Sequence, residues 1–222
     1  MDTPGYRCTL LLNRKINMHT FESWYKIIKQ NVVPVIELAK ECYKGGMIID
    51  VGSNLGSFTD SMIETYPEAE YHMFEPHPKF SSYLIEKYSS ANNVIVNLKG
   101  AGSEEVTAKI NFNNGNWGNN LISHQGEDIE IIRLDSYIKT NNLKNIGLIK
   151  IDVEYYEPFV LDGLKDYIEN TPNLPPIILE HDWNGSPYKD KWFEITEWLF
   201  YKYKYFQFNK DTPMYDVVLM PL

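Results

Sequence analysis

The 222-residue chain has little cysteine and no long apolar run. Its two cysteines, Cys8 and Cys42, lie far apart without metal-site spacing, so the sequence predicts neither a disulfide framework nor a cysteine metal centre. We interpret them as structural thiols in a reducing compartment, which predicts a cytoplasmic protein. No apolar stretch approaches the roughly 20 residues that cross a bilayer, and the first residues lack a signal-peptide pattern, so we expect no membrane insertion.

Positive charge is also scarce, because 21 Lys and Arg face 30 Asp and Glu, giving a formal net charge of −9. Proteins that bind nucleic acids draw much of their affinity from Lys and Arg on phosphates. No block of five or more basic residues is present, and the most basic tract, residues 201–205, alternates lysine with tyrosine. The composition therefore predicts no nucleic-acid partner and favours a neutral ligand.

What the chain does contain is an alternation of apolar strands and amphipathic helices. This alternation predicts an α/β fold with a mostly parallel sheet and helices on both faces. Pro34 should kink or restart the first helix. The expected strands are 47–51, 71–74, 93–98, 147–152 and 176–180, and the expected helices are 21–43, 55–66, 78–89, 157–169 and 189–200.

Three further segments read as extended chain. Residues 106–112 and 129–134 alternate apolar and polar side chains, which predicts a strand pair added at one sheet edge. Residues 204–208 and 215–220 predict a closing hairpin that makes one strand antiparallel. Residues 6–13 suggest a short strand or an extended arm.

The length suits a single α/β domain. We expect residues 46–222 to form this domain and residues 1–45 to form an N-terminal arm and helical cover over part of the site. The sequence leaves open whether the chain is a whole protein or a domain of a larger one.

Residues 47–58 are the most informative segment, because a buried strand that contains Asp50 runs into a glycine turn and then a helix. Gly52 and Gly56 can adopt positive φ and let a ligand approach the backbone. The free N–H groups of the following helix suit an anionic or hydrogen-bond-accepting ligand. The order Gly-Ser-Asn-Leu-Gly is neither a dinucleotide fingerprint nor a P-loop. We therefore expect a small ligand over residues 50–58, the alternative being a plain turn.

A second acid, Glu75, ends the next predicted strand, 25 positions after Asp50. In a strand–helix–strand unit, a carboxylate about 20 residues on can bond a ribose diol. The alternative for Glu75 is a solvated carboxylate at a strand end. Pro76 and Pro78 then stop the strand, and Pro78 suits the first turn of a helix.

Residues 50–56 and 74–78 together resemble the FkbM family of S-adenosylmethionine-dependent O-methyltransferases. Three later segments agree with this family in order: residues 133–137, 148–154 and 176–180. The resemblance covers about residues 46–182, and its Lys-Ile-Asp-Val-Glu and Phe-Glu-Pro-x-Pro elements are specific in combination. The chain departs from the family where Tyr155 and Tyr156 follow Glu154, since a Gly is usual there.

The resemblance implies a Rossmann-like class I methyltransferase fold that binds S-adenosylmethionine. It places Asp50, Gly52, Asn54 and Gly56 at the methionine part, Glu75 at the ribose and Ala101 near the adenine. The full set of expected cofactor-binding residues is Asp50, Gly52, Ser53, Asn54, Gly56, Ser57, Phe58, Glu75, Pro76 and Ala101.

The expected reaction is in-line methyl transfer to a hydroxyl, which ionises far above neutral pH and so needs activation. One hypothesis is a general base, with Asp152, Glu154 and His181 as candidate catalytic residues. The other is a divalent ion, Mg²⁺ or Mn²⁺, held by Asp152, Glu180 and Asp182. The plainer alternatives are a structural role for His181 and, for Glu154 and Glu157, capping of the helix that begins near Pro158.

We expect the acceptor hydroxyl to belong to a sugar, a glycan or a glycosylated metabolite. If the chain is a domain of a larger protein, we expect that protein to be a glycan-modifying enzyme. Trp117 on an Asn/Gly-rich loop could stack on an apolar sugar face, and Tyr155 and His77 are the other candidate acceptor contacts. Two alternatives remain open: an RNA methyltransferase on the same fold, and a non-catalytic module that binds S-adenosylmethionine.

Overall fold

A computed structural model describes residues 21–111, 121–123, 126–181, 185–208 and 215–222. The predicted arm at residues 6–13 and the candidate residues Trp117 and Asp182 lie outside these ranges. Among the helices that are described, none is long and apolar enough to cross a bilayer.

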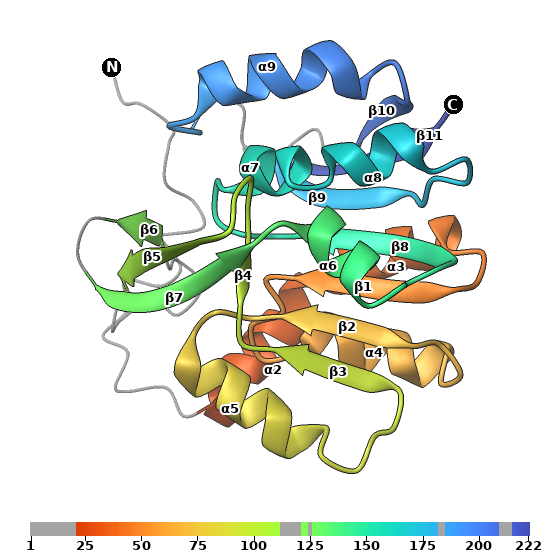
Figure 1. The fold of residues 1–222 in the computed structure, drawn as a ribbon. Coiled ribbons are helices and arrows are strands. Elements are labelled where there is room, and N and C mark those ends of the chain that lie inside the picture. Colours follow the sequence, from red (N-terminus) through yellow and green to blue (C-terminus); the bar gives the residue numbers. More distant parts are fainter. Residues whose placement is uncertain (1–20, 112–120, 124–125, 182–184, 209–214) are drawn as a thin grey trace, which may run out of the picture.

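The centre of the molecule is a seven-stranded sheet with the order β10-β11-β9-β8-β1-β2-β3 (Figure 1). Strand β11 runs antiparallel to both of its neighbours, and the other pairings in this sheet are parallel. The α/β fold and the closing hairpin are therefore confirmed. The strands are β1 (Met47–Val51), β2 (Tyr71–Phe74), β3 (Val94–Asn97), β8 (Ile146–Ile151), β9 (Ile177–His181), β10 (Tyr203–Phe208) and β11 (Tyr215–Pro221).

Helices cover both faces of this sheet, which is why the inner strands are apolar on both sides. Ile48 of β1 packs in a cluster with α3 and α4, whereas Ile49, the next residue, packs in a cluster with helices α6 to α9. The first group of helices is α2 (Phe21–Asn31), α3 (Val33–Cys42), α4 (Ser57–Thr65) and α5 (Pro78–Lys87). The second group is α6 (Leu134–Thr140), α7 (Glu157–Asp162), α8 (Lys165–Asn170) and α9 (Lys189–Leu199).

Two of the expected helices are divided in the structure. The first breaks at Val32, and α3 begins there with Pro34 in its first turn, as the fixed φ of proline favours. The fourth is divided into α7 and α8, with Gly163 at the end of α7. Helix α6 was not predicted as an element of its own.

A second, four-stranded sheet has the order β4-β7-β5-β6. The strand pair expected at the edge of the main sheet is therefore part of a separate sheet. In Figure 1 this sheet lies beyond the ends of β2 and β3 to which their arrows point. Ile110, Ile129 and Ile131 form its apolar face, and Tyr156 packs against them. Its strands are β4 (Gly100–Ala101), β5 (Val106–Asn111), β6 (Leu121–Ser123) and β7 (Glu127–Ile132).

Candidate active site

The loop between β1 and α4 has the left-handed backbone that its glycines predict. Gly52 has φ 76°, Gly56 has φ 79°, and Asn54 between them has φ 49°. A Cβ on Gly52 would stand 1.8 Å from the backbone oxygen of Asp152, which follows the neighbouring strand β8. Gly52 is therefore required by the packing of two loops, in addition to any close approach of a ligand.

Asp50 and Lys150 form a buried ion pair on neighbouring strands. The Lys150 Nζ lies 3.2 Å from Asp50 Oδ1 and 3.4 Å from Asp152 Oδ2, and it donates a hydrogen bond of 2.9 Å to the Gly52 oxygen. The Thr59 hydroxyl donates to the other Asp50 oxygen at 2.7 Å. Burial alone would lower the pKa of Lys150, but Asp50 and Asp152 raise it above its usual value. Lys150 is therefore a fixed cation between the ends of β1 and β8.

Glu75 ties the end of β2 to the β1 loop. Its Oε2 accepts the N–H of Asn54 and its Oε1 accepts the N–H of His77, both at 2.8 Å. Burial raises the pKa of Glu75 to about 7, although these two amides and Lys150 oppose the shift. An ionised carboxylate has about four lone-pair sites. Two remain to accept hydrogen bonds from a ribose diol, so the Glu75 carboxylate fits the expected cofactor.

Carboxylates crowd the ends of β8 and β9 on the face that carries Lys150. Glu180 of β9 stands directly opposite Asp216 of β11, and the Asp152 side chain is 44% exposed. Burial, followed by the charge of Asp152, raises the pKa of both Glu154 and Glu180 well above the ordinary value. These acids therefore hold protons more tightly than exposed carboxylates do.

The turn after β8 is strained and is anchored by Glu157. Glu154 has φ 54° and Tyr155 has φ 75°, and residues other than glycine rarely adopt such positive backbone angles. The buried Glu157 Oε1 accepts the N–H of Val153 at 3.0 Å. Burial raises the pKa of Glu157 to about 7, against the opposing effect of backbone amides.

His181 lies apart from this acidic group. Side chains alternate between the two faces along a strand, and Ile177 and Leu179 belong to the cluster under helices α6 to α9, so His181 shares their face. Its ring meets Trp192 of α9 edge-on at 4.3 Å between centroids. Glu180 and His181, which are adjacent in sequence, therefore serve opposite sides of the sheet.

His77 is placed as a helix cap. It is the N-cap of α5, its Nδ1 accepts the N–H of Lys79 at 3.2 Å, and its ring stacks on Phe80 at 4.2 Å. Burial lowers the pKa of His77 to about 4, so the ring is neutral at physiological pH. The expectation that His77 contacts an acceptor stays a prediction.

The other expected cofactor residues divide between the loop and the core. The Ser53 hydroxyl donates a hydrogen bond of 2.8 Å to the backbone oxygen of Asp50, and Ser57 begins α4 in a buried position. Phe58 and Ala101 are buried in apolar clusters, so both contribute packing. Pro76 follows Glu75 between β2 and α5.

Two residues of the site were not expected from the sequence: Thr59 and Asp216. Glu157 was expected as a cap of the helix that begins near Pro158, and it accepts the N–H of Val153 just before that helix. Asp216 had no sequence signal, because only the register of β11 against β9 brings it opposite Glu180.

For the metal hypothesis, no group of three or more His, Cys, Asp or Glu within the described ranges is arranged to hold an ion, and Asp182 lies outside those ranges.

Residues 50–207 match the family described as the methyltransferase FkbM domain. The chain belongs to this family. It is 27% identical over 145 residues to "Methyltransferase 1" of Beauveria bassiana, a match that covers 54% of this chain and 58% of that protein. It is 25% identical over 182 residues to "31-O-demethyl-FK506 methyltransferase FkbM" of Streptomyces tacrolimicus, covering 66% of this chain and 69% of that protein.

Solved structures show the same fold. A putative caffeoyl-CoA O-methyltransferase from Staphylococcus aureus superposes with a TM-score of 0.54 at 10% identity, and the match covers 96% of each chain. The main sheet is thus that of Rossmann-like methyltransferases, as expected. The FkbM family and this fold together support S-adenosylmethionine as the cofactor.

Proposed function

We propose that this FkbM-family chain is an S-adenosylmethionine-dependent O-methyltransferase that acts on a hydroxyl of a sugar, a glycan or a glycosylated metabolite. The observation that carries the proposal is the meeting of Asp50, Glu75 and Asp152 at the ends of three adjacent strands, with Lys150 between two of them. Ligands of open α/β sheets bind outside these carboxyl ends.

In this proposal Glu75 accepts the ribose hydroxyls, while the β1 loop from Gly52 to Gly56 lies along the amino-acid part of the cofactor. Glu75 is already oriented by the amides of Asn54 and His77, so little side-chain entropy is lost when the diol binds. Lys150 holds Asp50 and the Gly52 carbonyl in place from below.

When bound, the cofactor supplies an electrophilic methyl group on sulfur. The residues of the chain would orient the acceptor hydroxyl in line with that methyl group. They would take the hydroxyl proton as the oxygen–methyl bond forms and the sulfur–methyl bond breaks, which leaves S-adenosylhomocysteine. Asp152 is suited to this role because its carboxylate is partly exposed and is fixed on one side by Lys150. Glu154 is the second carboxylate near it, and burial together with the charge of Asp152 raises its pKa well above the ordinary value.

The placement of His181 favours Asp152 over His181 as the base. The His181 ring is buried against Trp192, on the face of β9 opposite to Glu180. We therefore propose a structural role for His181.

The test is release of S-adenosylhomocysteine from S-adenosylmethionine with a panel of glycosides and, in parallel, with total RNA. We expect glycoside-dependent release and no stimulation by RNA, because the chain has a net charge of −9. Asp152→Asn should lower kcat at least a hundredfold with little change in cofactor affinity, since a general base contributes about 10²- to 10⁴-fold. Stimulation by RNA alone, or full turnover by Asp152→Asn, would reject the proposal.

A further inference from the structure

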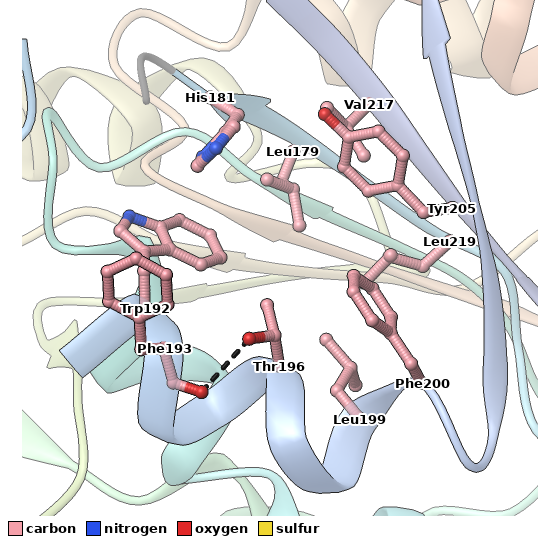
Figure 2. A pocket seen from close by; sticks show the side chains of 10 residues that line it. All are labelled: Leu179, His181, Trp192, Phe193, Thr196, Leu199, Phe200, Tyr205, Val217 and Leu219. Carbon is pink, nitrogen blue, oxygen red and sulfur yellow. Dashed lines mark hydrogen bonds between the residues drawn. The ribbon is translucent and has the colours of Figure 1, made fainter. Parts of the chain in front are cut away.

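A cavity of about 320 Å³ lies between α9 and the strands β9, β10 and β11. Figure 2 shows His181 and Trp192 together at one end and Phe200 with Tyr205 at the other, with Thr196 of α9 between the two ends. The floor is made by side chains of β9 and β11, including Leu179. This space is separate from the Asp50–Glu75 region that we assign to the cofactor.

Apolar side chains make up most of the cavity wall that the structure describes. Among these described lining residues, none is Asp, Glu, Lys or Arg. The Thr196 hydroxyl donates a hydrogen bond of 2.9 Å to the backbone oxygen of Phe193, so its proton is already bonded within the helix (Figure 2). A ligand with a charge would lose its hydration here without compensation. The lining therefore selects an uncharged, apolar ligand.

The rim of the cavity exposes large aromatic side chains. Phe193 is 56% exposed, Phe200 45% and Tyr205 41%. Contiguous exposed apolar surface marks binding sites, whereas scattered exposed apolar residues are ordinary. Here the three rings border one cavity, and Phe200 meets Tyr205 edge-on at 6.1 Å.

The size of the cavity limits the ligand. At about 30 Å³ for each water-sized group, the cavity has room for roughly ten carbon atoms. This is the lower end of the range for small-molecule sites, about 300–1,000 Å³. A single alkyl or isoprenoid chain, or one fused ring pair, fills such a space.

The cavity reaches the edge of the sheet at which we place the methyl-transfer reaction. Leu179, two residues before it, pairs with Ile151 of β8, and Asp152 follows Ile151. His181, the last residue of β9, lines the cavity, which therefore reaches the carboxyl end of that strand. The cavity and the acidic group lie on opposite faces of the sheet but share this edge.

We propose that the cavity under α9 binds an uncharged alkyl or isoprenoid chain of about ten carbons. Resting on the proposed function, we assign this chain to the acceptor, which makes the substrate a lipid-linked or otherwise alkylated glycoside.

Binding is tested first, by calorimetry without cofactor, using octyl β-D-glucoside below its micelle-forming concentration and methyl β-D-glucoside as the control. We expect saturable binding of the octyl compound only. Thr196→Phe, which fills the cavity, and Thr196→Glu, which places a charge in it, should each weaken binding at least tenfold. Thr196→Val keeps the volume and should bind normally. No saturable binding, or equal binding by Thr196→Phe, overturns the proposal.

Turnover and oligomeric state separate the remaining outcomes. KM for octyl glucoside should be at least tenfold below that for methyl glucoside, and Thr196→Phe should abolish the difference. Binding without turnover of either glucoside would leave the cavity assignment standing and reject the glycoside acceptor. Equal KM values for the two glucosides, without binding of the octyl compound in the cavity, would support the glycoside acceptor and reject the cavity assignment. A wild-type dimer that Thr196→Glu dissociates, seen by sedimentation velocity, would assign the cavity to self-association and overturn the proposal.

Discussion

The Lys150 ammonium lies 3.2 Å from the Asp50 carboxylate, and both side chains are almost completely buried, at 6% and 1% exposed. Their strands, β8 and β1, are hydrogen-bonded neighbours, with Lys150 and Asp50 as register partners. The pair therefore joins the two strand ends on which the cofactor loop and the acidic group depend.

Removing Lys150 should be strongly destabilising. Breaking a buried ion pair by deleting one partner leaves an uncompensated charge, which costs about 3–5 kcal/mol. We expect Lys150→Met to lower the free energy of unfolding in urea by this amount. Lys29→Met is the matched control: its pair with Glu64 is also 3.2 Å, but the side chains are 42% and 68% exposed, so the change should stay below about 1 kcal/mol. Equal effects of the two variants would show that the buried pair has no special role.

Affinity for the ribose part of the cofactor should rise with pH. The pKa of Glu75 is raised to about 7, so the free protein is largely protonated there below pH 7. A diol donates to the ionised carboxylate and stabilises it, which lowers the pKa of Glu75 on binding. Affinity therefore increases as pH rises through about 7 and levels off above.

The probe for this effect is 5′-methylthioadenosine, which carries the ribose diol but lacks the α-amino and carboxyl groups of the methionine part. We expect about tenfold tighter binding at pH 8 than at pH 6, or about 1.4 kcal/mol, and a flat profile for Glu75→Gln. Glu157→Gln is the matched control, because Glu157 also has a pKa of about 7 but clamps the Val153 turn instead. A flat wild-type profile would count against Glu75 as the ribose ligand.

Because the backbone at Tyr155 is left-handed, a glycine variant there should be more stable than an alanine variant, which is the reverse of the usual order. A side chain in this conformation costs about 1–2 kcal/mol, whereas glycine elsewhere costs about 0.5–1 kcal/mol in chain entropy. Tyr155→Gly should therefore be more stable in urea than Tyr155→Ala, by up to about 1 kcal/mol. At Tyr156, where φ is −90°, the Gly variant should instead be the less stable of the two. The same order at both positions would argue against strain at Tyr155.

Turnover should not depend on a divalent ion. The Lys150 ammonium already stands 3.4 Å from the Asp152 carboxylate, so a second cation at Asp152 would be repelled. We expect EDTA to leave the rate of S-adenosylhomocysteine release unchanged and added Mg²⁺ or Mn²⁺ to leave it unchanged as well. Loss of activity in EDTA that Mg²⁺ or Mn²⁺ restores would favour the metal hypothesis.

The order of the main elements could be predicted from the sequence, because apolar strands such as 47–51 alternate with amphipathic helices. The second sheet could not, since alternation identifies β5 and β7 as strands but says nothing about which sheet they join. Helix α6 has only seven residues and lacks a side-chain N-cap, so it leaves little trace in the sequence.

The candidate site was predictable along each strand and less so across strands. Lys150 and Asp152 share a face by alternation, and the structure brings them together. The same alternation separates Glu180 from His181, although the two residues are adjacent in sequence. Asp216 becomes a neighbour of Glu180 only through the register of the terminal hairpin, a long-range property that no local pattern encodes.

The most direct test of the central claim is to follow the methyl group itself. The protein would be incubated with S-adenosylmethionine labelled with ¹³C at the methyl carbon and with the glycoside that best stimulates turnover, and the product would be examined by NMR. We predict a new methyl signal with the chemical shift of a methyl ether, and its loss in Asp152→Asn. A methyl signal on nitrogen or carbon, or cofactor binding without any transfer, would contradict the account.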